Sequence, residues 1–525
     1  MPSHPQTNTL AKLPNNLINA FEEQNILIHD ERISVNLLVS KVASWYEKIR
    51  NAMDYGSDET ILRRTIERIL KRRLFLYSQP KSLAEDLIRE LIWGGYFPND
   101  SVPVMAEDMV AKSIDSHLKL KEYLARKKLL TDQTNTFIIQ LLSCDIHRIL
   151  AFNKNREAMA NFMFHILKDS VEIADDSKQT RDVQVFIAVR KNFGKDDSAF
   201  LKYRLFNQIF GRLSEQNVQK VSESFLEGYK EIKLQLTYPK KDRIFNHIKK
   251  VTPPFLILYD LLSIEKGKIR SLVKNEDEFR GAVFLICAER YGSIKSKVRT
   301  AIVRSFIFIL LTKAFIALFI EGTFERLFFG QVQWLYIGLN TVVPPTLMVL
   351  AGLGIKTPGE ENSEKIYKYI RAILFEDYPK IAPTLIVRKK GKTGGLREFI
   401  FSILWLLAIL LSFGLISIIL TKLHFNILSQ GIFLFFIAII SFLTYRIYQT
   451  ANVYSVIFIQ NIFTPILDFF FVPIIRVGRR LTEGLTQVNF MLIVIDFMIE
   501  APFKGLVGFF EQWFVFLAAK KEELE

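Results

Sequence analysis

The sequence contains few of the residues from which disulfide frameworks and metal centres are built. It has two cysteines, Cys144 and Cys287, and seven histidines in 525 residues. Two isolated thiols in helical patterns form no disulfide framework, and they favour a reducing compartment for the N-terminal part of the chain. Cys144 and His147 share a helix face and His165 follows, but a Cys–His pair at this spacing does not make a zinc site. A buried core pair is the better interpretation.

Sequence signatures of the common enzyme classes are also absent. The chain has no HExxH or GxSxG motif and no paired-carboxylate helix signature. The run Gly391-Lys392-Thr393 ends like a phosphate-binding loop, but Ile386 stands where that motif needs its first glycine. These absences argue against a conventional hydrolase, kinase or metalloenzyme, and no cofactor is expected. A lipid-modifying enzyme with its residues in irregular loops is retained as the third alternative.

Long apolar stretches dominate the last 220 residues. Each approaches the length of about 20 residues that an α-helix needs to cross a bilayer. The four stretches lie at 302–320, 334–355, 399–420 and 427–445. They predict a multi-pass membrane protein.

The N-terminal part has a different pattern, with apolar residues at three- and four-residue intervals between charged ones. Asp58 is a candidate N-cap of one of these helices. The predicted fold is all-α, with an N-terminal cytoplasmic helical bundle followed by a polytopic α-helical membrane domain. The predicted ranges are a disordered leader at 1–16, the helical domain at 17–295 and the membrane domain at 296–525.

Basic residues next to the spans set the expected orientation. Residues 201–300 carry 20 Lys and Arg against 11 Asp and Glu, and residues 351–400 carry 10 against 6. Positive charge concentrates on the cytoplasmic side of membrane proteins, so these segments and the N-terminal domain are expected there. No apolar signal core begins the chain, and insertion is expected to start near residue 302. The predicted location is the cell membrane, with anionic lipid headgroups as partners.

Two further apolar segments, 453–475 and 488–519, are interrupted by proline and charge. The pattern leaves open whether they span the membrane or lie in its inner interface.

Five charged residues in the apolar segments form a candidate intramembrane polar cluster. Three of them, Asp496, Glu500 and Lys504, follow at four-residue steps on one helix face. Lys313 and Asp468 complete the set. Because a charge in hydrocarbon needs a partner or a wet cavity, we expect Lys313 to pair with Asp468, Asp496 or Glu500.

The polar cluster has two interpretations. It could line a path for an ion or small solute, which the Pro344-Pro345 break in the second span also favours. The alternative, an amphipathic helix in the inner leaflet, is preferred.

The helix predicted at 61–75 carries a run of basic side chains opposite its apolar face. Contact with anionic lipid is a candidate role for Arg64, Arg68, Lys71 and Arg72. A solvated helix face is the simpler explanation, and nucleic acid is a poor candidate partner because no recognition motif accompanies the run.

Taken together, these features favour a non-enzymatic membrane-anchored scaffold or assembly factor whose helical domain binds a cytoplasmic protein partner. A transporter or channel is the alternative. The sequence leaves the oligomeric state open.

Overall fold

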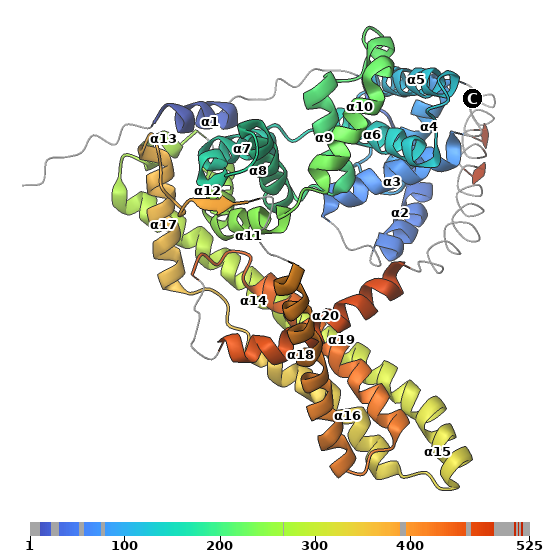
Figure 1. Cartoon of the computed structure of the whole chain (residues 1–525). Helices are drawn as coiled ribbons and strands as arrows, with labels where there is room; N and C mark the ends of the chain where they lie inside the picture. Colours follow the sequence, from blue (N-terminus) through green and yellow to red (C-terminus); the bar gives the residue numbers. More distant parts are fainter. Residues whose placement is uncertain are drawn as a thin grey trace, which may run out of the picture. The chain divides into compact units, whose positions relative to one another are not determined.

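The computed structural model describes residues 11–22, 31–51, 57–74, 79–265, 267–388, 395–457 and 464–487, together with 509, 510, 513, 516 and 517 (Figure 1). Helices dominate these residues, which confirms the prediction of an all-α fold. The chain divides into two compact units. We call residues 11–249 with 382–388 the helical unit, and residues 250–381 with 395–487 the membrane unit. The boundary predicted at 295 lies inside one continuous helix of the membrane unit.

The helical unit is built from eleven helices and a short 3₁₀ turn within the residues that the structure describes. Ser57, and not the predicted Asp58, caps α3, because its side chain accepts from the amide of Thr60. The bounds are α1 Lys12–Glu22, α2 Leu37–Asn51, α3 Asp58–Arg73, α4 Pro80–Trp93, α5 Met105–Arg126, α6 Asp132–Leu150, α7 Lys154–Leu167, η1 Lys168–Ser170, α8 Lys178–Asn192, α9 Ser198–Phe210, α10 Val218–Leu236 and α11 Lys241–Val251.

Two hydrophobic clusters hold this unit together, and α5 and α6 contribute to both. The first buries side chains of α3 and α4 such as Ile66 and Leu87 against Ile114 of α5. The second surrounds Phe137 of α6, which meets Phe225 edge-on with ring centroids 6.0 Å apart. Since α5 and α6 extend through both clusters, they fix the positions of the helices on either side.

The helical unit also contains two three-residue strands from distant parts of the chain. Strand β1, Val171–Ile173, pairs in parallel with β2, Leu385–Val387. Val171 lies opposite Leu385, and Val171 and Val387 are buried. The chain therefore re-enters the helical unit at 382–388, after two of the candidate membrane helices.

The membrane unit is organised around one long helix that continues through a π turn (Figure 1). Its elements are α12 Pro253–Ile264, α13 Ile269–Leu272, α14 Glu276–Ile316, the π turn η2 Ala317–Glu321, α15 Gly322–Phe329, α16 Trp334–Leu353, α17 Glu360–Phe375, α18 Gly395–Lys422, α19 Ile427–Ala451 and α20 Thr464–Gln487. A shared core joins α14, α16 and α19 through Ile309, Met348 and Phe436.

Four helices of this unit are long and apolar enough to cross a membrane, at the positions that the sequence predicts. They are Glu276–Phe328, Trp334–Leu353, Phe399–Lys422 and Ile427–Ala451. Their outward surfaces expose large apolar side chains, for example Leu311, Leu410 and Ile418. Apolar surface of this extent is stable in hydrocarbon and unfavourable in water, so the structure supports a membrane protein.

One asparagine joins three segments at the end of this bundle. The Asn362 side chain of α17 donates to the Tyr291 hydroxyl of α14 at 2.7 Å and to the Tyr454 carbonyl at 2.8 Å. Its oxygen accepts from the amide of Val456 at 2.8 Å. Because these groups are buried, the hydrogen bonds fix the chain that follows α19 against α14 and α17.

A glycine determines how closely α19 and α20 approach each other. A Cβ atom on Gly478 would lie 1.8 Å from the Ala438 carbonyl oxygen. Small residues allow such backbone contact between membrane helices.

We therefore predict that Gly478→Ala separates α20 from α19 and lowers the thermal unfolding midpoint of the detergent-solubilised protein. Gly431→Ala in α19 is the matched control, because a Cβ atom there meets nothing within 4 Å. Equal midpoints for the two variants would contradict the prediction.

Candidate functional site

The membrane unit contains a lysine–glutamate pair that is completely buried. Lys313 Nζ lies 2.6 Å from Glu321 Oε1, and both side chains are 0% exposed. Residues advance by about 100° each in a regular α-helix, so eight residues would turn Glu321 about 80° away from Lys313. The π turn at Ala317–Glu321 has more residues per turn and brings Glu321 back to the side of Lys313.

Side chains from two other helices complete the coordination of Glu321. Its Oε2 accepts from Asn340 Nδ2 of α16 at 2.8 Å and from the Ser429 hydroxyl of α19 at 3.3 Å. The Lys313 ammonium also lies 5.3 Å from the ring centroid of Phe436 in α19. Three helices therefore meet at one carboxylate, and its charge is neutralised where no water reaches it.

A second buried glutamate lies one turn further along. Glu325 accepts from the Gln333 amide and from Asn426 Nδ2, each at 2.7 Å. The first apolar stretch ends at residue 320, and the sequence pattern predicts that Glu321 and Glu325 lie in a short loop outside. In the structure the helix instead continues to Phe329, and Glu321 has the buried donors Lys313 and Asn340.

The predicted members of the intramembrane polar cluster have different positions. Lys313 is buried as expected, but its acid is Glu321 rather than Asp468, which is exposed on α20. Asp496, Glu500 and Lys504 lie outside the described residues. Glu321 follows Lys313 by eight residues in the sequence, but only the π turn brings the two side chains together.

We predict that Lys313→Met lowers stability by about 3–5 kcal/mol, because it leaves Glu321 as an uncompensated buried charge. The double variant Lys313→Met/Glu321→Gln should recover most of the loss, since glutamine keeps an oxygen for Asn340. Thermal unfolding in detergent provides the measurement, and Lys422→Met, at an exposed position, is the control. A single Lys313→Met variant as stable as the unmodified protein would rule out the pairing.

The basic residues of α3 are engaged mainly within the helical unit. Arg68 pairs with buried Glu47 at 3.0 Å, and Arg72 pairs with buried Glu90. Lys71 lies 2.7 Å from Glu67, and the more exposed Arg64 is 3.8 Å from Asp197. The run thus forms intramolecular ion pairs, and contact of these residues with anionic lipid remains a prediction.

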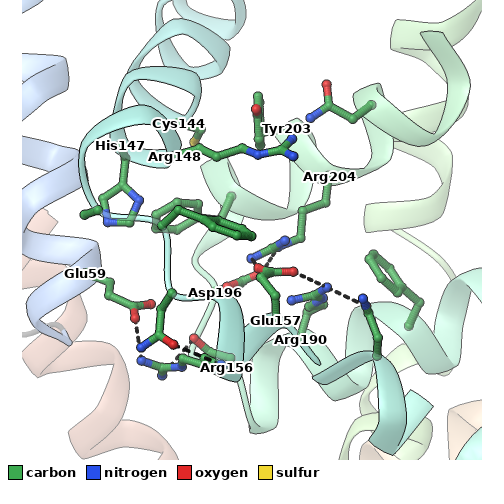
Figure 2. Close-up of a pocket in the computed structure, with 18 of the residues that line it drawn as sticks. Glu59, Cys144, His147, Arg148, Arg156, Glu157, Arg190, Asp196, Tyr203 and Arg204 are labelled. Atoms are coloured by element: carbon green, nitrogen blue, oxygen red, sulfur yellow. Dashed lines mark hydrogen bonds and ion pairs between the residues drawn. The ribbon is translucent and has the colours of Figure 1, made fainter. Parts of the chain in front are cut away.

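The helical unit encloses a cavity of about 430 Å³ (Figure 2). Its wall comes from five helices, the loop between α6 and α7 and the loop before α9, and it combines arginines, carboxylates, amides and aromatic rings. The charged and reactive lining residues are Glu59 of α3, Cys144, His147 and Arg148 of α6, Arg156 and Glu157 of α7, Arg190 of α8, Asp196, and Tyr203 and Arg204 of α9.

Ion pairs organise one side of the cavity. Glu157 accepts from Arg190 at 2.8 Å and from Arg204 at 2.6 Å, and Asp196 also accepts from Arg204. Figure 2 shows these side chains together, with Arg156 donating to Glu59 at 2.7 Å nearby. Burial raises the pKa of Asp196, whereas the guanidinium of Arg204 opposes that rise. Each carboxylate that lines the cavity is therefore paired with an arginine.

Two buried residues of α6 lie on the cavity wall. Burial raises the pKa of the Cys144 thiol well above its usual value, so the thiol is protonated and unreactive at neutral pH. Burial, together with the cations of Arg63, Arg204 and Arg156, lowers the pKa of His147 to about 4. The imidazole is therefore neutral at pH 7. The predicted Cys144–His147 core pair is buried, and among the described residues no group of three or more metal-ligating side chains occurs.

Sequence reasoning missed this cavity. Its residues are spread over 150 positions, and none belongs to a motif. The available signal was the placement of Arg190 and Arg204 within stretches that are otherwise largely apolar. A charged residue in the middle of a buried helix face needs a partner, but the identity of the partner depends on tertiary packing.

Because the pKa of His147 falls from 6.5 in the unfolded chain to about 4 in the folded protein, unfolded molecules bind a proton that folded ones exclude. Folding stability should thus decrease as the pH falls from 6.5 to 4, by up to roughly 3 kcal/mol from this group. We predict that His147→Gln reduces this decrease in thermal unfolding measured between pH 7.5 and 4.5. Exposed His165→Gln is the control. Parallel pH profiles for the His147 variant and the unmodified protein would contradict the assignment.

No family model, curated protein or solved structure matches this chain.

Proposed function

We propose that this protein is a membrane-anchored, non-enzymatic binding protein, with the membrane unit as anchor and the helical unit as the part that binds a protein partner. The proposal rests on one observation: the Glu321 carboxylate is buried and every partner it has comes from the helices around it. Its carboxylate pairs with Lys313 and accepts hydrogen bonds from Asn340 and Ser429, and Glu321 has no exposed surface. A charge pair sealed in this way locks three helices together, as a structural anchor requires.

Exposed apolar side chains on the helical unit support a protein partner. Val104, Met105 and Met109 lie close together at the start of α5, and Met105 is 61% exposed. Residues four apart share a helix face, so Met105 and Met109 form one apolar surface. Exposed methionines adapt to varied partner surfaces, and exposed apolar patches mark interaction sites.

Charge supports the orientation that we propose. The excess of Lys and Arg at 201–300 and 351–400 flanks the candidate spans. The positive-inside rule then places both segments, and with them the helical unit, on the cytoplasmic side of the cell membrane. The same cations would attract anionic lipid headgroups.

A transporter is the second candidate function, and one observation favours it. Buried Asn340 has an Oδ1 atom without a partner among the described residues. It lies beside the π turn and precedes Pro344 and Pro345, each of which removes a backbone donor from α16. Irregular helices of this kind form ion and solute sites in transporters.

Two measurements separate these functions. We predict that photo-cross-linkers at Met105 or Met109 give a discrete protein adduct in intact membranes, whereas one at exposed Leu285 of α14 does not. We also predict that purified protein in liposomes conducts neither H⁺, Na⁺ nor K⁺ above protein-free liposomes. Ion flux that Asn340→Ala abolishes, without any specific adduct at α5, would favour the transporter.

A further inference from the structure

The cavity of the helical unit has the size and lining of a small-molecule site. Its volume of about 430 Å³ falls within the range of roughly 300–1,000 Å³ that ligand pockets occupy. It lies within one compact unit, so its walls are held by a single core. Its function is independent of whether the helical unit also binds a protein.

Two buried polar atoms on the wall have no hydrogen-bond partner in the described structure. They are Nε2 of His147, which is 6% exposed, and Nε of Arg190, which is 4% exposed. Buried polar groups in folded proteins are nearly always paired, so the wall keeps hydrogen-bonding capacity that the described side chains do not use. Both residues line the cavity.

The charge of the wall indicates the sign of that occupant. Three carboxylates line the cavity, and each is paired with an arginine from the same wall. Arg148 is the fourth arginine, and the described residues offer it no carboxylate; it lies over the Phe152 ring at 5.7 Å. The excess positive charge is therefore at Arg148, which is exposed and reachable from solvent. Guanidinium groups recognise carboxylate and phosphate oxygens with paired hydrogen bonds.

Aromatic rings provide the apolar part of the wall. Phe200 meets the His147 ring edge-on, with ring centroids 5.0 Å apart. Phe186 is held beneath Arg190, whose guanidinium carbon lies 5.2 Å from the ring centroid. Phe152 is 53% exposed and lines the same cavity. Rings arranged in this way favour a flat organic group over a bare ion.

We propose that this cavity binds a small organic anion that carries a flat ring, with its carboxylate or phosphate on Arg148. The ring lies among Phe152, Phe186 and Phe200.

The test is calorimetric titration of the full chain, held in nanodiscs of uncharged lipid so that no lipid anion competes. The probes are adenosine 5′-monophosphate and benzoate as the two kinds of ring anion, adenosine as the uncharged ring, and inorganic phosphate as the anion without a ring. We expect at least one ring anion to bind at least tenfold more tightly than adenosine and than inorganic phosphate. Preference for the monophosphate or for benzoate distinguishes phosphate from carboxylate ligands.

The variant for this test is Arg148→Gln, with Arg126→Gln on α5 as the matched control because Arg126 is also exposed. We expect Arg148→Gln to weaken binding of the ring anion at least tenfold, Arg126→Gln to leave it unchanged, and both variants to keep the thermal unfolding midpoint. Absence of heat from every probe at 10 mM would mean that the cavity holds water only and would overturn the proposal. Equal binding of adenosine and its monophosphate, or an unaffected Arg148→Gln variant, would overturn it as well.

Discussion

A lysine buried in an apolar helical bundle requires an acid within hydrogen-bonding reach, and the membrane unit is arranged around this requirement. The π turn departs from regular α-helical geometry and thereby places Glu321 beside Lys313. Asn340 and Ser429 then attach α16 and α19 to the same carboxylate. A rotation or shift of either helix would break a buried hydrogen bond to this carboxylate, so the ion pair and its two hydrogen bonds together link the register of three helices.

The two units use buried charge in different ways. In the membrane unit, the buried carboxylates of Glu321 and Glu325 find their donors in the same unit. In the helical unit, the network around Glu157 also satisfies its acids, yet Arg148 on the same cavity wall has no carboxylate partner among the described residues. Charge closes the first site and leaves the second able to accept a ligand. This contrast supports the proposal that the membrane unit is the anchor and that the helical unit binds a partner or ligand.

The sequence was sufficient for features that depend on local composition. Apolar stretches located the four candidate membrane helices, and the cost of burying Lys313 showed that it needs a partner. The sequence was not sufficient for ion-pair partners and the cavity, which depend on tertiary packing. The partner Glu321 was assigned to a loop because a π turn leaves no clear mark in composition. Arg68 and Arg72 read as a surface run, although Glu47 and Glu90 cover them. The cavity requires five helices that no single sequence window contains.

The pairing of β1 with β2 has a consequence for the order of events during synthesis. Val171 is buried, and its strand partner is Leu385. The ribosome makes Leu385 after it has made the first two candidate membrane helices. The helical unit, although it occupies the start of the chain, therefore completes its fold only after those helices have left the ribosome. A fragment released at residue 295 would carry an unpaired strand edge, and such edges promote aggregation.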